Sequence, residues 1–492
     1  VYDFETETHN FIANNILCHN TEGEKIAWDV GVNLYPYRDI VKRLEFHEVT
    51  KKAFLEALKE YRNINLNLVK AQIVRRIADR FIGFALSNLL KEKFHEENIS
   101  AGRVQTPVLG WVIERDKEAR KKYPYLKISY KDLNFGIFLE NINNRELKNL
   151  DIQKVILKVI KEEILEKNPL PPYTTSEILK DASEKLKFSA DKTMKLLQEM
   201  FELGIHTYHR TDSTRVSSAG INVAREYIFE KFGQEYFKGR TWQEGGAHEC
   251  IRPTRPLDVE ALKEFALLNN IKLTKDHYRL YDLIFKRFVA SQMREVVLKE
   301  ANILCKVIGT IKKKKEERPF EASIEKVFTT EIIKEGFNKI IPLKVYALDF
   351  KDEKVIDSHN PDLKIEKTKV SKVLPFTQGT LIEEMKKRKI GRPSTYAQIV
   401  QTLLKRGYVI EIKNFLYPTK RGKEVYEFLK KNFEKWISEE FTRRLEEMMD
   451  QVEEGKVDYQ EIIKTFLEVI EEAKKLADSK WENESKLDNN HL

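Results

Sequence analysis

Apolar residues recur every four positions between residues 69 and 81, and this spacing predicts a helix with one buried stripe. The stripe consists of Val69, Ile73, Ile77 and Phe81. The flank of the same helix is basic, at Lys70, Arg75, Arg76 and Arg80. Because Asp79 follows Arg75 by four residues, part of this positive charge is expected to be paired on the helix surface.

A second helix is predicted after the stretch SAGRVQ, where Thr106 can cap and Pro107 can open a helix that runs to about Arg120. This places Arg103 and Gln105 at a helix N-terminus, where backbone N–H groups and the helix dipole favour a phosphate. An ordinary arginine in a solvated loop is the alternative for Arg103.

Two regions change to the alternating pattern of strands, residues 126–141 and 296–350. The second region contains three candidate strands, EANILCKVIGT, FEASIEKVFTT and LKVYALDF. The basic run 312–318 lies between the first two and is expected to be a solvated hairpin tip, with a DNA contact as the alternative. A helical insertion, residues 174–293, separates the two strand regions. This order predicts a chain that leaves its domains and re-enters them.

Two stretches repeat the order helix, turn, helix, glycine and extended segment, residues 174–211 and 380–419. Both patterns are typical of winged helices, which contact nucleic acid or protein. In the second copy the expected helix start, helix end, left-handed cap and hairpin turn are Pro393, Arg406, Gly407 and Lys413-Asn414. We interpret the pair as nucleic-acid readers, with a protein-contact module as the alternative.

The 492 residues are 34% charged and 41% hydrophobic, which is enough for several domains of about 100–200 residues. The net charge of +9 suits a polyanionic partner only if the excess is localised, because 87 basic residues face 78 acidic ones. No apolar run approaches the ~18 residues of a membrane span, and no signal peptide opens the chain. Cys18, Cys250 and Cys305 form no CxxC metal site. We expect a reduced, cytoplasmic protein with no membrane partner.

The first residues, VYDFETETHNFIANNILCHNT, begin with Val1, so we expect the chain to start inside a longer reading frame. This stretch resembles the C-terminal end of an intein. The matching positions are Asp3, His9, His19, Asn20 and Thr21. Asn20 can cyclise on its own carbonyl, His19 can act as the acid, and Thr21 can receive the acyl group. Residues 1–20 would then be absent from the mature protein; a strand hairpin with a solvent-facing turn is the alternative.

The stretch GIHTYHRTDSTRVS, residues 204–217, gathers polar chemistry around one tyrosine. A phenol of pKa ~10 is only about 0.1% ionised at pH 7, so phenoxide costs roughly 4 kcal/mol without help from neighbouring charge. Arg210 could stabilise a phenoxide at Tyr208 or charge on a phosphate, and Asp212 could hold Arg210 by a bidentate pair. A tyrosine that only packs a core is the alternative, but it leaves Arg210, Asp212 and Ser213 unexplained.

Four stretches in this order resemble the signatures of type IA DNA topoisomerases across residues 21 to about 455: SAGRVQTPVLGWV, GIHTYHRTDSTRVS, GGAHECIRPTRP and GRPSTYAQIVQTLLKRGYV. Within that family, TEGEKIAWDV, EFHEVT, LPPYTTSEILKDA and His209 resemble the reverse gyrases. The resemblance implies an α+β multidomain fold. It implies a toroidal arch of winged-helix-like helical domains and a β-rich hinge domain, with the remnant of a Toprim domain.

On this resemblance the chain divides into eight segments. They are an intein remnant, 1–20; the end of the Toprim domain, 21–50; the helical base domain, 51–125 and 376–475; the β-rich gate domain, 126–173 and 294–375; the helical domain with the catalytic tyrosine, 174–293; and a polar tail, 476–492.

The resemblance also implies roles for single residues. Tyr208 would attack a DNA phosphodiester, form a 5′-phosphotyrosine and free a 3′-hydroxyl, with Arg210 stabilising the transition state. His248 would assist proton transfer or hold Asp212, and Arg252 would contact phosphate. The positions expected to grip the DNA strand are Arg103, Gln105, Arg392, Ser394 and Tyr396.

In the family, Asp-x-Asp precedes TEGE, and these carboxylates hold Mg²⁺ near the scissile phosphate. Here only Glu22, which matches the third acidic position, and Glu24 remain as a partial metal site. Clustered carboxylates suit Mg²⁺, a hard cation that takes oxygen ligands. The intein resemblance places the interruption within this motif, so we expect the isolated chain to bind DNA and to cleave it poorly.

Three functions stay open from the sequence. The first is the topoisomerase module of a reverse gyrase, which would use ATP through an N-terminal helicase-like half and supercoil DNA positively. No GxxxxGK[ST] loop occurs in this chain. The second is an ATP-independent type IA topoisomerase that relaxes negative supercoils. The third is an inactive DNA-binding fragment. In all three the partner is DNA, with a single-stranded segment where cleavage occurs.

Overall fold

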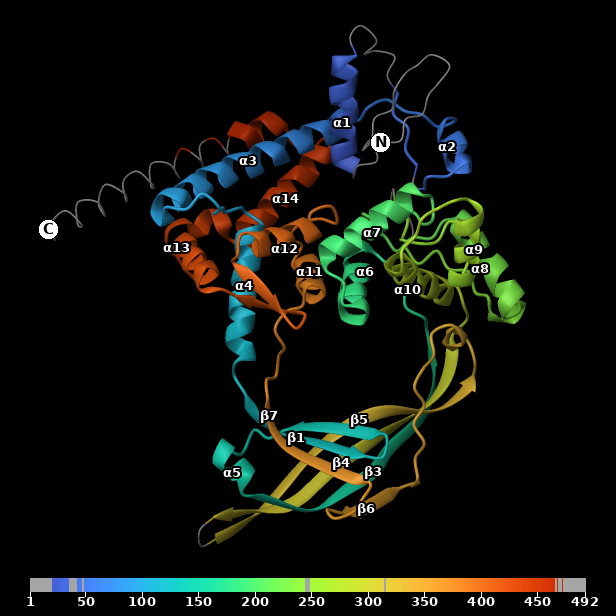
Figure 1. Ribbon diagram of the computed structural model, residues 1–492, viewed down its shortest axis with the longest axis vertical. Helices are drawn as coiled ribbons and strands as arrows, with labels where there is room; N and C mark the ends of the chain where they lie inside the picture. Colours follow the sequence, from blue (N-terminus) through green and yellow to red (C-terminus); the bar gives the residue numbers. More distant parts are fainter. Residues whose placement is uncertain are drawn as a thin grey trace, which may run out of the picture. The chain divides into compact units, whose positions relative to one another are not determined.

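The computed structural model describes residues 20–34, 42–46, 48–243, 248–313, 316–464, 467 and 471 (Figure 1). The chain divides into two compact units. Unit 1 comprises Val1–Glu114, Thr174–Asp212 and Phe376–Leu492, and unit 2 comprises Arg115–Tyr173 and Ser213–Pro375. The structure thus groups residues 213–293 with the strands, whereas the sequence interpretation kept them with the tyrosine segment.

Unit 1 is built mainly from helices around one apolar core. Its first segment contains α1 (Asn20–Asn33), α2 (Lys51–Ala57), α3 (Leu66–Phe94) and α4 (Gln105–Ala119), whose last residues belong to unit 2. Its second segment contains α6 (Thr175–Asp181), a π-helical turn (Ala182–Leu186) and α7 (Ala190–Glu202). Its third segment contains α11 (Gln378–Lys387), α12 (Tyr396–Lys405), β8 (Val409–Ile412), β9 (Phe415–Pro418), α13 (Lys420–Ile437) and α14 (Glu439–Glu453).

Unit 2 combines two antiparallel sheets with helices. The three-stranded sheet has the order β2-β1-β7, with β1 (Tyr123–Tyr130), β2 (Leu133–Phe138) and β7 (Leu363–Val370). The four-stranded sheet has the order β5-β4-β3-β6, with β3 (Leu150–Lys167), β4 (Val296–Lys313), β5 (Glu316–Lys334) and β6 (Glu353–Asp357). The helices are α5 (Asn144–Lys148), α8 (Ser218–Lys231), α9 (Val259–Leu268) and α10 (Lys275–Ser291), with 3₁₀ turns Gln234–Tyr236 and Phe337–Lys339. The α+β class expected from the sequence is confirmed.

The two sheets share one apolar core because their strands alternate buried and exposed side chains. Leu126, Ile128 and Tyr130 of β1 are buried on one face. β4 and β5 pair up to Lys313 and Glu316, so the basic run does lie at a hairpin end. The predicted strand at 343–350 is wrong: this segment forms no named strand, and a single backbone bond from Tyr346 to Thr329 ties it to β5.

Helix α3 exists where the periodicity predicts it, but it is longer and buries a different stripe. Its buried apolar residues are Val69, Ala71, Val74, Ala78, Ile82, Leu86 and Leu90, and Gln72 is buried as well. Ile73 and Ile77 are only half-buried, and the side chain of Phe81 lies outside the described part of the chain. The reason is that α3 packs against both α1 and α14, so two neighbours share its surface. The side chain of Asn65 caps the first turn, and His95 ends the helix in the left-handed conformation.

The winged-helix pattern is complete in the second copy only. There α11 and α12 precede the β8–β9 hairpin, whose turn residues Lys413 and Asn414 both have positive φ angles, 51° and 68°. Helix α12 begins at Tyr396 rather than Pro393, because Arg392 to Thr395 form a hydrogen-bonded turn. Within 174–212, all of which the structure describes, no strand follows α7.

No helix among the described residues is long and apolar enough to cross a membrane.

Two glycines at helix ends offer a matched test of local backbone geometry. Gly204 and Gly407 have similar φ angles, 63° and 66°, but a Cβ on Gly204 would lie 2.3 Å from the carbonyl oxygen of Val49, whereas a Cβ on Gly407 would meet nothing within 4 Å. We expect Gly407→Ala to cost about 1 kcal/mol of unfolding free energy from the left-handed conformation alone. Gly204→Ala should cost clearly more, because the clash is with backbone. Equal losses of stability in denaturant unfolding would contradict this interpretation.

Candidate functional site

The segment that carries Tyr208 leaves helix α7 through a tight left-handed turn at Gly204. The amide of Gly204 donates to the carbonyl of Phe201 at 2.8 Å, and the amide of Ile205 donates to the carbonyl of Met200 at 3.0 Å. These bonds satisfy carbonyls at the end of α7 and direct residues 206–212 away from the helix axis. Tyr208 therefore sits in an irregular segment that is fixed at its start by the end of a helix.

Thr175, the first residue of α6, fixes the other side of this segment. Its hydroxyl donates to the carbonyl of His209 at 2.6 Å and accepts from the amide of Thr211 at 2.8 Å. The amide of Thr175 donates to the carbonyl of Thr211 at 2.9 Å. Sequence reasoning gave Thr175 no role. The visible signal is the capping box of Thr174 and Glu177, which marks a helix start but not its long-range partner.

Aromatic rings surround Tyr208, whose side chain is only 7% exposed. The ring of Phe201 lies 5.3 Å from that of Tyr208 in an edge-to-face arrangement, and the ring of His209 lies 5.6 Å away. His206 and His209 are both fully buried. Burial lowers the pKa of His206 to about 4 and lowers that of His209 well below its usual value. Both rings are therefore neutral at physiological pH.

Arg210 and Asp212 lie in the same segment, but they do not form the bidentate pair considered from the sequence: among the described residues, no ion pair joins them. Asp212 is exposed at the surface. Neighbouring protein atoms nevertheless desolvate its carboxylate and raise the pKa of Asp212, while the positive charges of Lys386 and Arg392 act to lower it. Lys386, from α11, also donates to the hydroxyl of Thr174 at 3.2 Å. The cations that Asp212 faces thus come from the third segment of unit 1.

Two of the residues expected to grip DNA are brought together in unit 1. Arg103 precedes α4 and Arg392 precedes α12, and both form ion pairs with Glu446 of α14, at 3.0 and 3.1 Å. The side-chain amide of Gln105 donates to the hydroxyl of Ser100 at 3.4 Å. Ser394 is half-buried and Tyr396 is buried, and this burial raises the pKa of Tyr396.

The two residues expected from AHECIRP lie in unit 2. The carbonyl of His248 accepts a hydrogen bond from Nε of Arg215 at 3.2 Å. Arg252 is buried, and its guanidinium contacts Glu249 at 2.7 Å and the carbonyl of Pro253 at 3.0 Å. Glu249 therefore orients the guanidinium of Arg252, and the phosphate contact expected from the sequence stays a prediction.

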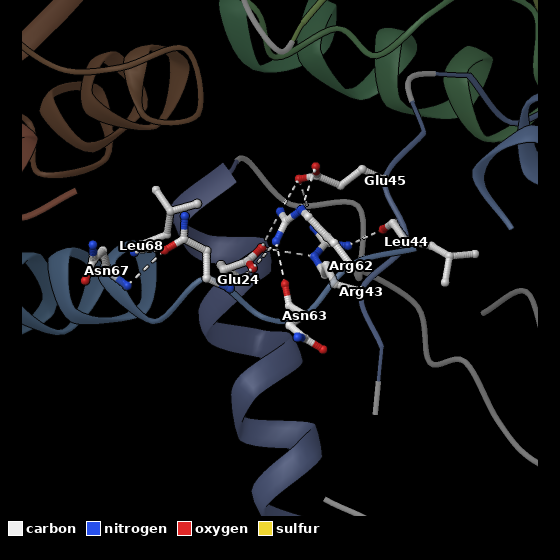
Figure 2. Close-up of polar contacts among 9 residues, drawn as sticks. Glu24, Arg43, Leu44, Glu45, Arg62, Asn63, Asn67 and Leu68 are labelled. Atoms are coloured by element: carbon white, nitrogen blue, oxygen red, sulfur yellow. Dashed lines mark hydrogen bonds and ion pairs between the residues drawn. The ribbon is translucent and has the colours of Figure 1, made fainter. Parts of the chain in front are cut away.

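Glu24, expected as part of a metal site, is fully buried against arginines (Figure 2). Its carboxylate accepts hydrogen bonds from Arg62 at 2.6 and 3.1 Å, from Arg43 at 3.2 Å and from the amide of Asn65 at 2.5 Å. Burial opposes its ionisation, but the contacts with Arg62, Asn65 and Arg43 outweigh it and lower the pKa of Glu24. With its oxygens occupied by donors, Glu24 does not fit a Mg²⁺ ligand, which corrects the expectation from the sequence.

Glu22 belongs to helix α1, but its side chain lies outside the described part of the chain. Among the described residues, no group of three or more His, Cys, Asp or Glu side chains could hold a metal ion. Of the predicted splicing residues, His9 and His19 lie outside the described residues, and Asn20 and Thr21 are described only as the first residues of α1.

A family described as DNA topoisomerase matches residues 63–464. The chain belongs to the type IA DNA topoisomerases. The solved structure of full-length topoisomerase I from Thermotoga maritima is similar to this type IA topoisomerase, with a TM-score of 0.73 and 32% identity, over 92% of this chain and 76% of that one.

Two curated relatives of this topoisomerase carry a more specific name. Reverse gyrase 1 from Aquifex aeolicus is 48% identical over 471 residues, which cover 93% of this chain and 39% of the relative. Reverse gyrase from Pyrococcus furiosus is 48% identical over 461 residues, which cover 92% of this chain and 36% of the relative. The chain therefore spans less than two fifths of the length of these relatives.

Removing the Thr175 hydroxyl tests whether α6 holds the Tyr208 segment of this topoisomerase. We expect Thr175→Val to lower the unfolding free energy by about 1–3 kcal/mol, because the buried His209 carbonyl and Thr211 amide lose their partner. Thr175→Ser keeps the hydroxyl and is the matched control, with a much smaller loss. Denaturant unfolding measures both variants. A valine variant as stable as the serine variant would show that the hydroxyl does not anchor the segment.

The buried histidines predict a loss of stability in acid. His206 has a folded pKa of about 4 against an ordinary value of 6.5, so the unfolded chain binds the proton first. Its contribution is complete above pH 6.5 and is lost as the pH falls towards 4, by up to about 3 kcal/mol. We expect His206→Leu to flatten this part of the profile of unfolding free energy against pH. An unchanged profile in the variant would contradict the assignment.

Proposed function

We propose that this chain is the topoisomerase module of a reverse gyrase. In this proposal it cleaves one DNA strand through a 5′-phosphotyrosine, allows strand passage and reseals the break. Joined to a helicase-like ATPase half, it would supercoil DNA positively. The observation that carries the proposal is the 48% identity with relatives named reverse gyrase over more than nine tenths of this chain. A cytoplasmic location stays a prediction.

The chemistry proposed for Tyr208 follows from the segment that holds it. The phenol oxygen would form a bond to phosphorus while the bond to the 3′ oxygen breaks, and the phenol proton would leave as the 3′-hydroxyl gains one. The phosphodiester count is unchanged, so the step reverses without ATP. The bonds at Gly204 and Thr175 support this role because they fix the segment before DNA binds.

Arg210 is the cation proposed to stabilise the phosphate in the transition state. It is half-buried two residues after Tyr208, and its Nε has no hydrogen-bond partner among the described residues. Because no carboxylate in the described part of the chain pairs with Arg210, its guanidinium is available to a developing negative charge. His248 lies in unit 2, and its part in proton transfer stays a prediction.

Mg²⁺ remains a proposal for the complete protein rather than for this chain. The described residues do not provide its ligands, because Glu24 is occupied by arginines, and Glu22 would need carboxylates from upstream sequence. We also propose that residues 1–20 are the end of an intein that interrupts the carboxylate motif, because they resemble an intein end and because the carboxylates expected before Glu22 are missing. ATP would act only through the helicase-like half.

The second candidate is an ATP-independent topoisomerase that relaxes negative supercoils. The likeness to a structure titled topoisomerase I, at 32% identity, favours it less than the higher identity with the reverse gyrases does. An inactive DNA-binding fragment is the third candidate. Supercoiling assays on the complete protein with and without ATP separate the first two, and a covalent adduct with DNA separates both from the third.

Covalent capture tests the nucleophile. End-labelled single-stranded DNA is incubated with Mg²⁺ and the chain, alone or with the upstream half of the same gene product, and the reaction is quenched with detergent. We expect little labelled protein from the chain alone, because the metal ligands are incomplete, and a labelled band when the upstream half is present. Full cleavage by the chain alone would contradict the proposal that its metal site is incomplete.

The controls for this experiment are two phenylalanine variants. Tyr208→Phe should abolish the labelled band, because no phenol oxygen remains to attack phosphorus. Tyr61→Phe, which removes the hydroxyl of an exposed tyrosine, should leave the band unchanged. A band that persists in Tyr208→Phe would overturn the assignment of the nucleophile, and no band even with the upstream half present would favour the inactive fragment.

A further inference from the structure

One buried carboxylate in unit 1 holds three arginines. The side chain of Glu446, on α14, is 6% exposed, and one of its oxygens contacts Arg103 at 3.0 Å. Its other oxygen contacts Arg75 at 3.0 Å and Arg392 at 3.1 Å. These arginine contacts outweigh the effect of burial and keep the pKa of Glu446 below its usual value. The carboxylate is therefore ionised and shared among three cations.

The three arginines come from separate parts of the chain. Arg75 lies on α3, Arg103 in the turn before α4, and Arg392 in the turn before α12. One helical turn before Glu446, the hydroxyl of Thr442 donates to the backbone carbonyl of Arg103 at 2.9 Å. Helix α14 thus fixes both the backbone and the side chain of Arg103, and it brings Arg392 to the same point.

The charge of Glu446 alone does not balance the charges of its three arginines. Three guanidinium groups face the single buried carboxylate of Glu446, which leaves an excess of two positive charges. Two further carboxylates pair with these arginines from the outside, and Glu453 of the same helix lies close enough to interact with Arg75 and Arg392. Asp79, 49% exposed, contacts Arg103, and Asp450, 55% exposed, contacts Arg392 at 3.1 Å.

The buried carboxylate of Glu446 and the exposed carboxylates of Asp79 and Asp450 differ in how easily a phosphate can displace them from the arginines. The Arg392–Asp450 pair is open to solvent on both sides, and an exposed ion pair contributes only about 0–1 kcal/mol, so a phosphate can replace Asp450 at little cost. The pair of Asp79 with the buried Arg103 is harder to replace. Breaking a buried pair costs about 3–5 kcal/mol, so Glu446 stays with its arginines. Asp450 thus competes with a polyanion for Arg392, whereas Glu446 keeps all three arginines in place.

We propose that Glu446 is a positioning residue that presets Arg75, Arg103 and Arg392 as a site for two neighbouring backbone phosphates of single-stranded DNA. Asp450 occupies Arg392 until DNA displaces it. The inference adds Arg75 to the DNA-binding residues. It rests on the proposed DNA contacts of Arg103 and Arg392 and names what orders them.

The direction in which two substitutions change DNA affinity separates a positioning role of Glu446 from an effect of net charge. If only net charge mattered, loss of any one acidic side chain of this cluster would tighten DNA binding, because repulsion from phosphate falls. If Glu446 positions the arginines, Glu446→Gln weakens binding, since its amide N–H groups oppose guanidinium donors. Asp450→Asn tightens binding, because DNA no longer competes with a carboxylate for Arg392.

The experiment measures binding of the full chain to fluorescein-labelled single-stranded oligothymidine by anisotropy over a series of salt concentrations. For Glu446→Gln we expect the dissociation constant to rise about tenfold or more. The slope of log K against log salt should fall by about 0.7 for each phosphate that the variant no longer neutralises. For Asp450→Asn we expect a lower dissociation constant and a slope at least as steep as that of the unmodified chain. Arg75→Ala should weaken binding and reduce the slope in the same direction as Glu446→Gln.

Glu447→Gln is the matched control, because it makes the same change on the same helix at an exposed residue that faces Arg443 rather than the cluster. It should leave the slope unchanged. A Glu446→Gln protein that binds as tightly as Glu447→Gln overturns the inference. If Glu446→Gln fails to fold, as its melting curve would show, Asp450→Asn is compared with Glu447→Gln, which removes the same charge outside the cluster. Clearly tighter binding by Asp450→Asn than by Glu447→Gln supports the inference, and equal or weaker binding overturns it. Absence of salt-dependent binding by the unmodified chain would instead overturn the proposed function.

Discussion

Buried carboxylates that each hold several cationic groups connect the parts of this chain that are far apart in sequence. Glu24 joins α1 to Arg43, Arg62 and the start of α3, and Glu446 joins α14 to three further arginines. Desolvating such charges is costly, so removing one partner of a buried pair destabilises the fold by about 3–5 kcal/mol. Their value lies in geometry, because a carboxylate with two oxygens and several guanidinium partners allows few arrangements of the helices that supply them.

The Tyr208 segment depends on the same kind of long-range fixing, but with neutral groups. A helix end supplies one fixed point at Gly204, and the hydroxyl of Thr175 supplies the second. Between these points the aromatic rings of Phe201 and His209 pack against the tyrosine. The segment is irregular in backbone yet well connected, which is what the role proposed for Tyr208 would require, because a nucleophile must be held in one orientation.

Local rules predicted much of the fold. The turn at Lys413-Asn414 and the cap at Gly407 follow from residue type alone, and both form as expected. Periodicity found α3 but not its buried face, since Ala78 and Ile82 are buried where Ile77 was expected. Local rules could not predict which side chains meet across the fold. Arg103 and Glu446 are 343 residues apart in the sequence. Arg210 was expected to pair with Asp212 because the two are close in sequence, but the cations that act on Asp212 come from α11 and the turn before α12.

The ion-pair cluster around Glu24 also bears on how this protein responds to heat. The hydration of charged groups becomes less favourable as temperature rises, so the cost of burying Glu24 with Arg43 and Arg62 falls on heating. Apolar contacts do not gain in the same way, because hydrophobic stabilisation per unit area levels off. The junction between α1 and α3 therefore becomes relatively stronger, compared with the apolar cores of the two units, as the working temperature increases.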